Sequence, residues 1–231
     1  MTPPSPAASR PVALVTGASR GIGRAVAEEL GRTHHVLVGG RDADAVAAVV
    51  AALPSAEPFV AELTGGELPA LPERLDVLVH SAGVEDGDTV EATTLETWRR
   101  VFEVNVFAVA ELTRLALPAL RRAEGIVVVI NSGSGLASGA GSAVYSGSKF
   151  AARALTDALR EEERGRVRVS SIHPGRVDTD MQRALVAKEG NAYDTDFTIT
   201  PEMVAATVRV AVDLPASGTV ESLSVRPVRR R

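Results

Sequence analysis

The stretch PVALVTGASRGIG, Pro11 to Gly23, decides the fold. It begins with an apolar, β-branched run that is typical of a buried strand, and a helical pattern starts at its end. The turn between them carries Gly17, Gly21 and Gly23 in the spacing GxxxGxG. Glycines at a strand-to-helix turn let backbone amides approach a pyrophosphate, and the helix N-terminus adds positive partial charge. The stretch therefore predicts the first βα unit of a dinucleotide-binding domain.

The rest of the chain repeats this alternation of short apolar runs and longer helical patterns. Further strands are expected at 36–40, 58–63, 76–83, 125–132, 167–175 and 221–227, and helices at 21–32, 42–53, 94–122, 142–164 and 201–214. Strands that are apolar on both faces and separated by helices indicate a parallel sheet covered on both sides. We therefore expect a single-domain, doubly wound α/β fold of the Rossmann type, with about seven strands and helices on both faces.

Composition bounds the class of protein. The 231 residues, 45% hydrophobic and 23% charged, are typical of one globular domain, expected at 11–228. Residues 1–10, rich in Pro and Ser, predict a disordered leader, and 229–231 predict a frayed tail. A net charge of −4 gives no sign of the basic surface that nucleic-acid binding requires. No apolar run is long enough to span a membrane. With no cysteine and no paired histidines, we expect a cytoplasmic protein without a metal site.

The end of the second predicted strand carries information about the cofactor. NAD sites usually place a carboxylate there to bind the ribose 2′-hydroxyl. Here the position reads Gly40-Arg41, and Arg20 lies nearby in the glycine turn. Two guanidinium groups bind a 2′-phosphate through charge-assisted hydrogen bonds. The sequence therefore predicts NADP(H) rather than NAD(H).

The stretch YSGSK places Tyr145 four residues before Lys149 at the start of a predicted helix. Residues at i and i+4 share one helix face. A free tyrosine has a pKa of about 10, and a nearby cation favours the phenolate. The pair therefore predicts an acid/base device in which Lys149 lowers the pKa of Tyr145. Taken alone, the same spacing also fits an ordinary helix start capped by Ser142.

Together these motifs resemble the short-chain dehydrogenase/reductase superfamily, from Val12 to Pro227. TGASRGIG resembles the cofactor motif, HSAG (residues 80–83) takes the place of the family's NNAG, and HPGRVDT (residues 173–179) resembles its PG motif. The C-terminal TPEMVAATVRVAVDLP is similar to the branch of NADP-dependent 3-hydroxy acid and serine dehydrogenases.

The resemblance implies roles for individual residues. Tyr145 is the expected proton donor and acceptor, Ser132 binds the substrate oxygen, Lys149 binds the nicotinamide ribose, and Asn105 holds a water. Glu62 replaces an aspartate usual near the adenine. The cofactor contacts that the resemblance implies are Gly17, Ser19, Arg20, Gly21, Ile22, Gly23, Arg41, Glu62, Leu63, Ala82, Gly83, Asn105, Tyr145, Lys149, Pro174, Gly175, Val177 and Thr179.

The expected activity is hydride transfer between NADP(H) and a small ketone, aldehyde or 3-oxo/3-hydroxy acid and the matching alcohol. A protein that senses NADP(H) without turnover is the alternative, disfavoured because a sensor needs no proton donor. Residues 176–200 are expected to form a substrate loop with an apolar lid, or else a plain disordered loop. The helix at 94–122 is apolar around much of its circumference, and with the resemblance it indicates a homodimer or homotetramer.

Overall fold

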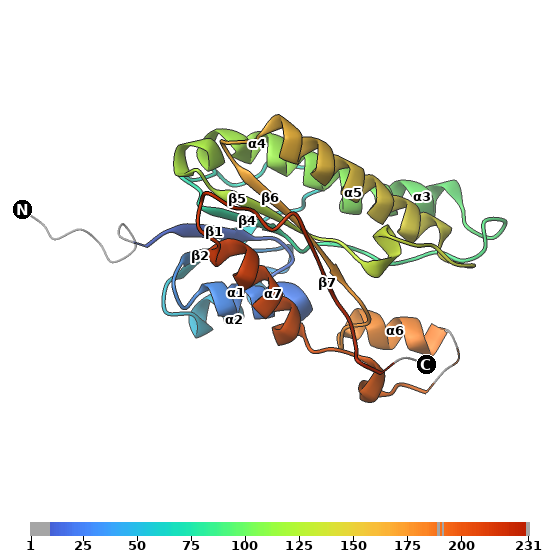
Figure 1. The fold of residues 1–231 in the computed structure, drawn as a ribbon. Coiled ribbons are helices and arrows are strands. Elements are labelled where there is room, and N and C mark those ends of the chain that lie inside the picture. The colour runs from blue at the N-terminus through green and yellow to red at the C-terminus, as the bar shows by residue number, and fades with distance from the viewer. Residues whose placement is uncertain (1–9, 189, 191, 230–231) are drawn as a thin grey trace, which may run out of the picture.

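The structure, a computed structural model, describes residues 10–188, 190 and 192–229. Seven parallel strands form one sheet in the order β3-β2-β1-β4-β5-β6-β7 (Figure 1). The strands are β1 (Val12–Val15), β2 (His35–Gly40), β3 (Ala56–Val60), β4 (Val77–His80), β5 (Ile126–Ile130), β6 (Arg168–Pro174) and β7 (Ser222–Val225). Nearly all of the expected leader and the last two residues of the expected tail lie outside the described residues.

Helices cover both faces of the sheet (Figure 1). One face carries α1 (Gly21–Leu30), α2 (Ala43–Ala52) and α7 (Pro201–Asp213), and the other carries α3 (Leu95–Phe102), α4 (Ala108–Ala123) and α5 (Ala143–Glu162). Successive side chains of β1 enter the two different cores, Ala13 and Val15 on one face and Leu14 on the other. The doubly wound α/β fold predicted from the apolar runs is confirmed.

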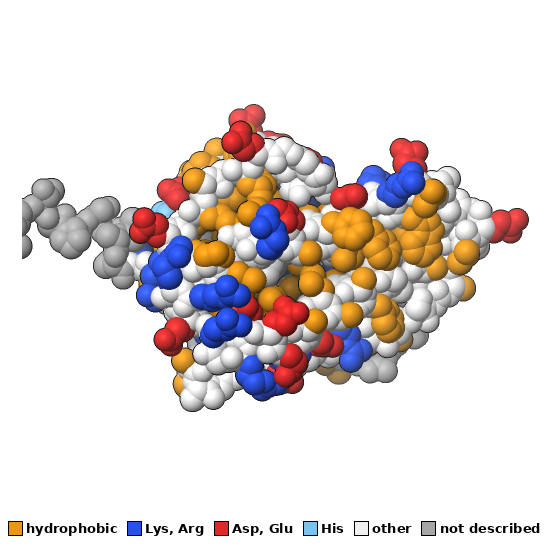
Figure 2. Space-filling model, turned by 90° about the horizontal axis from the view of Figure 1, so that it is seen from above, with side chains coloured by type: hydrophobic (Ala, Val, Ile, Leu, Met, Phe, Trp, Pro, Cys, Tyr) orange, Lys and Arg blue, Asp and Glu red, His pale blue; other side chains and the backbone are white. Residues whose placement is uncertain are grey.

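The layer of α3, α4 and α5 exposes hydrophobic side chains. Phe107 is 52% exposed, Phe150 42% and Leu115 38%. Figure 2 looks down on this layer and shows hydrophobic side chains gathered across it. No helix among the described residues is both long and apolar enough to cross a bilayer.

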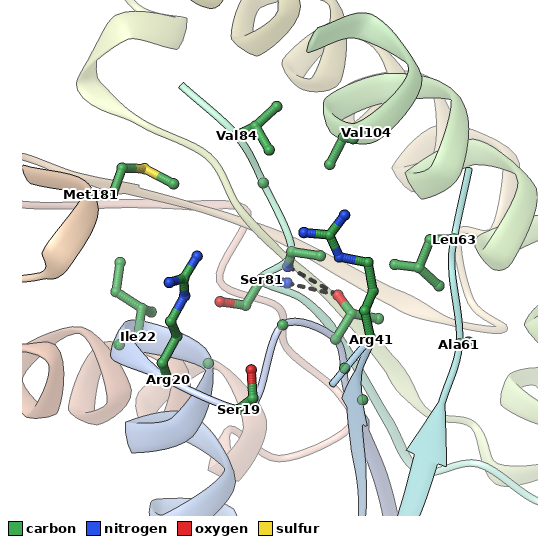
Figure 3. A pocket seen from close by; sticks show the side chains of 18 of the residues that line it. Ser19, Arg20, Ile22, Arg41, Ala61, Leu63, Ser81, Val84, Val104 and Met181 are labelled. Carbon is green, nitrogen blue, oxygen red and sulfur yellow. Dashed lines mark hydrogen bonds between the residues drawn. The ribbon is translucent and has the colours of Figure 1, made fainter. Parts of the chain in front are cut away.

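A crevice forms where the strand order reverses, because β1 lies between β2 and β4. Thr16, the first residue after β1, bridges the two halves. Its Oγ1 accepts the backbone N–H of Ser81 and of Ala82, each at 3.1 Å, and these bonds are drawn in Figure 3. In open α/β sheets ligands bind at this point, beyond the carboxyl ends of the strands.

The long helix expected at 94–122 is interrupted. A π-helical turn, Glu103–Phe107, separates α3 from α4. Thr94 caps α3, since its Oγ1 accepts the N–H of Thr97 at 3.2 Å. The wide turn contains Asn105, whose side chain is anchored to the loop after β4. Such turns occur frequently at functional sites.

The segment 176–200 is not the loop that the sequence suggested. It contains α6 (Asp180–Lys188) and a short 3-10 turn, Thr195–Phe197. Thr179 accepts the N–H of Gln182 at 3.3 Å, and good helix formers follow it. Thr179 therefore starts a helix where we expected irregular chain. Residues 189 and 191 of this segment lie outside the described residues.

Candidate active site

A cavity of about 230 Å³ opens at the crevice between β1 and β4 (Figure 3). Its walls come from the glycine turn after β1, the ends of β2 and β4, and the start of α6. The predicted cofactor residues that line it are Gly17, Ser19, Arg20, Gly21, Ile22, Gly23, Arg41, Glu62, Leu63, Ala82, Gly83 and Thr179.

The glycine turn has no room for side chains at two of its glycines. Gly17 has a φ of +64°, and a Cβ on it would lie 2.8 Å from the Cα of Ala82. A Cβ on Gly23 would lie 2.2 Å from the carbonyl oxygen of Gly17. The turn therefore needs glycine for its backbone conformation and for the close contact of α1 with β1. These residues fit the pyrophosphate of a dinucleotide placed at the N-terminus of α1.

Two arginines supply positive charge at the adenosine end of the cavity. Figure 3 shows the side chains of Arg20 and Arg41 reaching into the hollow on either side of Ser81. Arg41 lies 3.3 Å from Glu62 and is 72% exposed. Burial alone would raise the pKa of Glu62, but hydrogen bonds from Thr64 and the ion pair with Arg41 lower it. Glu62 therefore stays ionised and orients Arg41 without burying it.

The predicted catalytic side chains of α5 and of the loop after β5 come together. Tyr145 is hydrogen-bonded to the hydroxyl of Ser132. The Nζ atom of Lys149 lies 5.7 Å from the centre of the Tyr145 ring and donates to the carbonyl of Ile130 at 3.2 Å. A phenol, a hydroxyl and an ammonium group thus lie close together. The spacing predicted this for Tyr145 and Lys149, and the family resemblance implied it for Ser132.

The pKa of Tyr145 corrects one expectation. Burial raises it above its usual value, the negative charge of Glu85 raises it further, and the bond to Ser132 acts in the opposite direction. Burial lowers the pKa of Lys149 to about 8, while Glu85 opposes that change. The expected lowering of the Tyr145 pKa by Lys149 is therefore wrong for this structure, because loss of solvent and the charge of Glu85 raise the pKa of Tyr145.

Asn105 is buried, and its side chain ties the loop after β4 to α5. Its Oδ1 accepts the N–H of Val84 at 2.9 Å. Its Nδ2 donates to the carbonyl of Val84 at 2.9 Å and to the hydroxyl of Ser148 at 3.0 Å. Both amide hydrogens are used by protein partners. The side chain is therefore a structural link between two parts of the site, and the water that the resemblance implies at Asn105 stays a prediction.

Gly83 joins the catalytic cluster to the cavity. It lines the cavity, and a Cβ on it would lie 3.4 Å from Oδ1 of Asn105 and 3.8 Å from Nζ of Lys149. Gly83 is therefore a point at which the cavity wall comes within contact distance of Lys149. Among the described residues no cluster of metal ligands occurs.

Residues 11–190 match the family model for short chain dehydrogenases. The chain belongs to the short-chain dehydrogenase family. The resemblance inferred from the cofactor, YxxxK and PG motifs is thereby confirmed.

Known short-chain dehydrogenases match this one over almost its whole length. The serine 3-dehydrogenase of Rhizobium radiobacter is 31% identical over 94% of this chain and 94% of that protein. The alcohol dehydrogenase of Thermococcus sibiricus, solved with 5-hydroxy-NADP, is 26% identical with a TM-score of 0.86 over 96% of this chain and 99% of that one. A putative NAD(P)-dependent gluconate 5-dehydrogenase from Beutenbergia cavernae, solved with NADP, is 34% identical with a TM-score of 0.84 over 94% and 95%.

Two residues that position Ser132, the predicted catalytic serine of this short-chain dehydrogenase, were missed in the sequence. Asn131 accepts the N–H of Ser132 at 2.9 Å and donates to the carbonyl of Lys149 at 3.2 Å. His173 lies with Nδ1 3.0 Å from the carbonyl oxygen of Ser132. Both are polar residues inside or beside apolar strand runs. That unusual position is the feature of the sequence from which their role could have been suspected.

Six predicted cofactor residues of the short-chain dehydrogenase do not line the cavity: Asn105, Tyr145 and Lys149 in the cluster beside it, and Pro174, Gly175 and Val177. Pro174 and Val177 are buried, and Gly175 donates its N–H to the carbonyl of Val225 at 2.7 Å. Residues that do line it and were not predicted include Phe59, Ala61, Val104 and Met181. These residues come from the end of β3 and the residue after it, the π-helical turn and α6. These segments lie far apart in the sequence, so no local motif could have indicated that they meet.

Proposed function

We propose that this protein is an NADP(H)-dependent oxidoreductase that interconverts a small carbonyl compound and the corresponding alcohol. The observation that carries the proposal is the junction at Gly83, where the glycine-lined cavity meets the cluster of Ser132, Tyr145 and Lys149. The proposal is supported by related structures solved with NADP or a derivative bound.

The cavity residues present fit the phosphate-bearing half of the cofactor. The backbone of the turn at Gly17 and Gly21 would hold the pyrophosphate, and Arg20 and Arg41 would hold the 2′-phosphate. Thr179, at the start of α6, would lie at the nicotinamide end. When bound, the cofactor supplies a hydride for reduction or accepts one in oxidation.

Within this proposal the side chains handle the proton. In reduction the carbonyl carbon gains the hydride and the oxygen takes the proton of the Tyr145 hydroxyl, which leaves an alcohol and a phenolate. The raised pKa of Tyr145 keeps the proton on this group at neutral pH, so it starts as a donor. Ser132 hydrogen-bonds the substrate oxygen, and the Lys149 ammonium group stabilises the phenolate that remains. In oxidation each transfer runs in reverse.

The test is Tyr145→Phe with NADPH and a panel of small ketones and aldehydes. We expect turnover to fall by about 10²-fold or more, the usual contribution of general acid catalysis. NADPH affinity, measured by fluorescence titration, serves as the control for folding of the cavity. Near-normal turnover by the variant would contradict the proposed role. Tight NADPH binding without turnover of any carbonyl by the native protein would favour the sensor alternative.

A homo-oligomer is the second part of this proposal. The exposed side chains of Phe107, Leu115 and Phe150 lie on the layer formed by α4 and α5 and the turn before α4. Exposed apolar surface of this kind marks protein contacts, and a second copy of the chain is the partner that the family resemblance implies.

A further inference from the structure

Arg226 follows directly after β7, at the same edge of the sheet as the predicted catalytic serine. The strands β5, β6 and β7 are parallel neighbours in the sheet. Their carboxyl ends therefore meet at one edge, where Ser132 lies just beyond β5 and Gly175 just beyond β6. A side chain that starts at the end of β7 has to cross the end of β6 to reach the turn after Ser132.

The Arg226 side chain makes this crossing. A Cβ on Gly175 would lie 3.5 Å from the Cγ of Arg226, so the first part of the side chain packs against the turn after β6. A Cβ on Gly133, the residue after Ser132, would lie 3.5 Å from Nη2 of Arg226 and 3.7 Å from its Cζ. The guanidinium group therefore lies against the turn that carries Ser132, and Gly133 places no side chain between them.

The charge of this guanidinium group is not neutralised by a protein partner. Among the parts of the chain that the structure describes, no hydrogen bond and no ion pair engages Arg226, which is an exposed residue. Arg229, three residues further along, pairs with Asp196. An arginine carries five N–H donors in a planar arrangement that matches a carboxylate. Those of Arg226 are therefore available to a ligand that lies beside Ser132.

We propose that Arg226 determines substrate specificity by binding an acid group of the substrate while Ser132 binds the oxygen that reacts. The guanidinium lies at the residue after Ser132, and consecutive Cα atoms are only about 3.8 Å apart. A carboxylate one methylene group away from the reacting carbon spans such a distance. The substrate class is then short hydroxy acids and, in reduction, the matching oxo acids, held by a bidentate, charge-assisted bond. The inference rests on the proposed carbonyl and alcohol chemistry and narrows its substrate.

The experiment compares three alcohols of similar size and different charge with NADP⁺: 3-hydroxybutanoate, 3-hydroxybutanamide and 4-amino-2-butanol. We expect kcat/KM to be highest for the acid and lowest for the amine, which a guanidinium repels. Arg226→Gln should reduce the acid-to-amide ratio of kcat/KM about tenfold or more, the scale of hydrogen bonds to a charged group. Arg226→Lys, which keeps the charge and loses the planar pair of donors, should retain part of the preference.

Arg229→Gln is the matched control, because it removes the same charge from a side chain that already has a carboxylate partner in Asp196. It should leave the acid-to-amide ratio unchanged. An unchanged ratio in Arg226→Gln, even with all three alcohols slowed, would reduce Arg226 to a support for the turn after Ser132 and overturn the proposal. Thermal unfolding of each variant checks that the fold is retained.

Binding of the acid and the amide to the NADP⁺-saturated protein, measured by calorimetry, separates the two proposals. Turnover without charge preference overturns the role of Arg226 and leaves the oxidoreductase standing. Acid-selective binding that Arg226→Gln abolishes, in the absence of any turnover, supports the role of Arg226 and overturns the oxidoreductase. Absence of both turnover and acid-selective binding overturns both.

Discussion

At the scale of single residues, burial has the largest effect on the pKa values of Tyr145 and Lys149. Lys149 is 7% exposed, and its ammonium group has few partners to replace lost water. Desolvation disfavours the charged form of a lysine and the charged form of a tyrosine alike. The two pKa values therefore move apart, so that Tyr145 holds its proton more firmly and Lys149 loses its proton more easily.

This arrangement predicts how stability depends on pH. Lys149 titrates at about 8 in the folded protein and at its ordinary value of 10.5 in the unfolded chain. Between these values the unfolded chain binds more protons at this position, so the free energy of unfolding rises with pH, by at most about 1.4 kcal/mol for each pH unit. Urea unfolding of the native protein and of Lys149→Met, at several pH values from about 7.5 to 9.5, measures this term.

The free energy of unfolding of the native protein, relative to that of Lys149→Met, should increase as the pH rises across this range. The range stops below pH 10 because the raised pKa of Tyr145 has the opposite effect above it. A difference that stays constant with pH would show that Lys149 titrates normally.

Arg41 yields a prediction about cofactor choice. Arg41→Ala should weaken NADPH binding about tenfold or more and leave NADH binding nearly unchanged, because it removes a charge-assisted bond to the 2′-phosphate. Fluorescence titration with both cofactors measures the effect. Arg24→Ala is the control, since Arg24 pairs with Glu28 on α1 and does not line the cavity. Equal losses for NADPH and NADH would contradict the assignment.

At the scale of elements, the turn from β1 into α1 determines whether the cofactor site forms. Its geometry depends on contact between backbones, so that even a methyl group has no room at Gly17 or Gly23. The same turn is tied to β4 by Thr16. The cofactor site therefore depends on the same contacts that pack the glycine turn against the sheet.

Gly17→Ala should lower the free energy of unfolding by about 2 kcal/mol or more, because it combines a left-handed φ with a clash against the backbone of Ala82. Thermal unfolding measures the loss, and NADPH titration should show weakened binding. Gly65→Ala is the matched control, since a Cβ there meets nothing within 4 Å and the φ is not positive. Equal melting temperatures for the two variants would contradict the prediction.

At the scale of the whole molecule, the two helical layers differ in their outer surfaces. The α4 and α5 layer carries Phe107, Leu115 and Phe150, and α7 on the opposite layer exposes Val210. We expect light scattering at micromolar concentration to show a dimer or larger assembly. Leu115→Glu combined with Phe150→Glu should shift it toward monomer, because two charges would be buried in the contact.

Val210→Glu, an equally polar change on the other layer, should leave the assembly intact. A monomeric native protein, or dissociation by Val210→Glu alone, would exclude the α4 and α5 layer as the contact surface.

The amino-acid sequence by itself determined the alternation of strands and helices, the glycine turn and the pairing of Tyr145 with Lys149. These features arise from local rules: apolar periodicity, the φ freedom of glycine, and the i, i+4 geometry of a helix. Residues close in the sequence are close in the folded chain, so their relation can be predicted without the fold.

Only the tertiary structure decided the direction of the Tyr145 pKa and the link from Asn105 to Val84. Each depends on segments dozens of residues apart that meet at the carboxyl edge of the sheet. Burial and Coulomb interactions depend on distances in space, and no spacing along the chain encodes those distances.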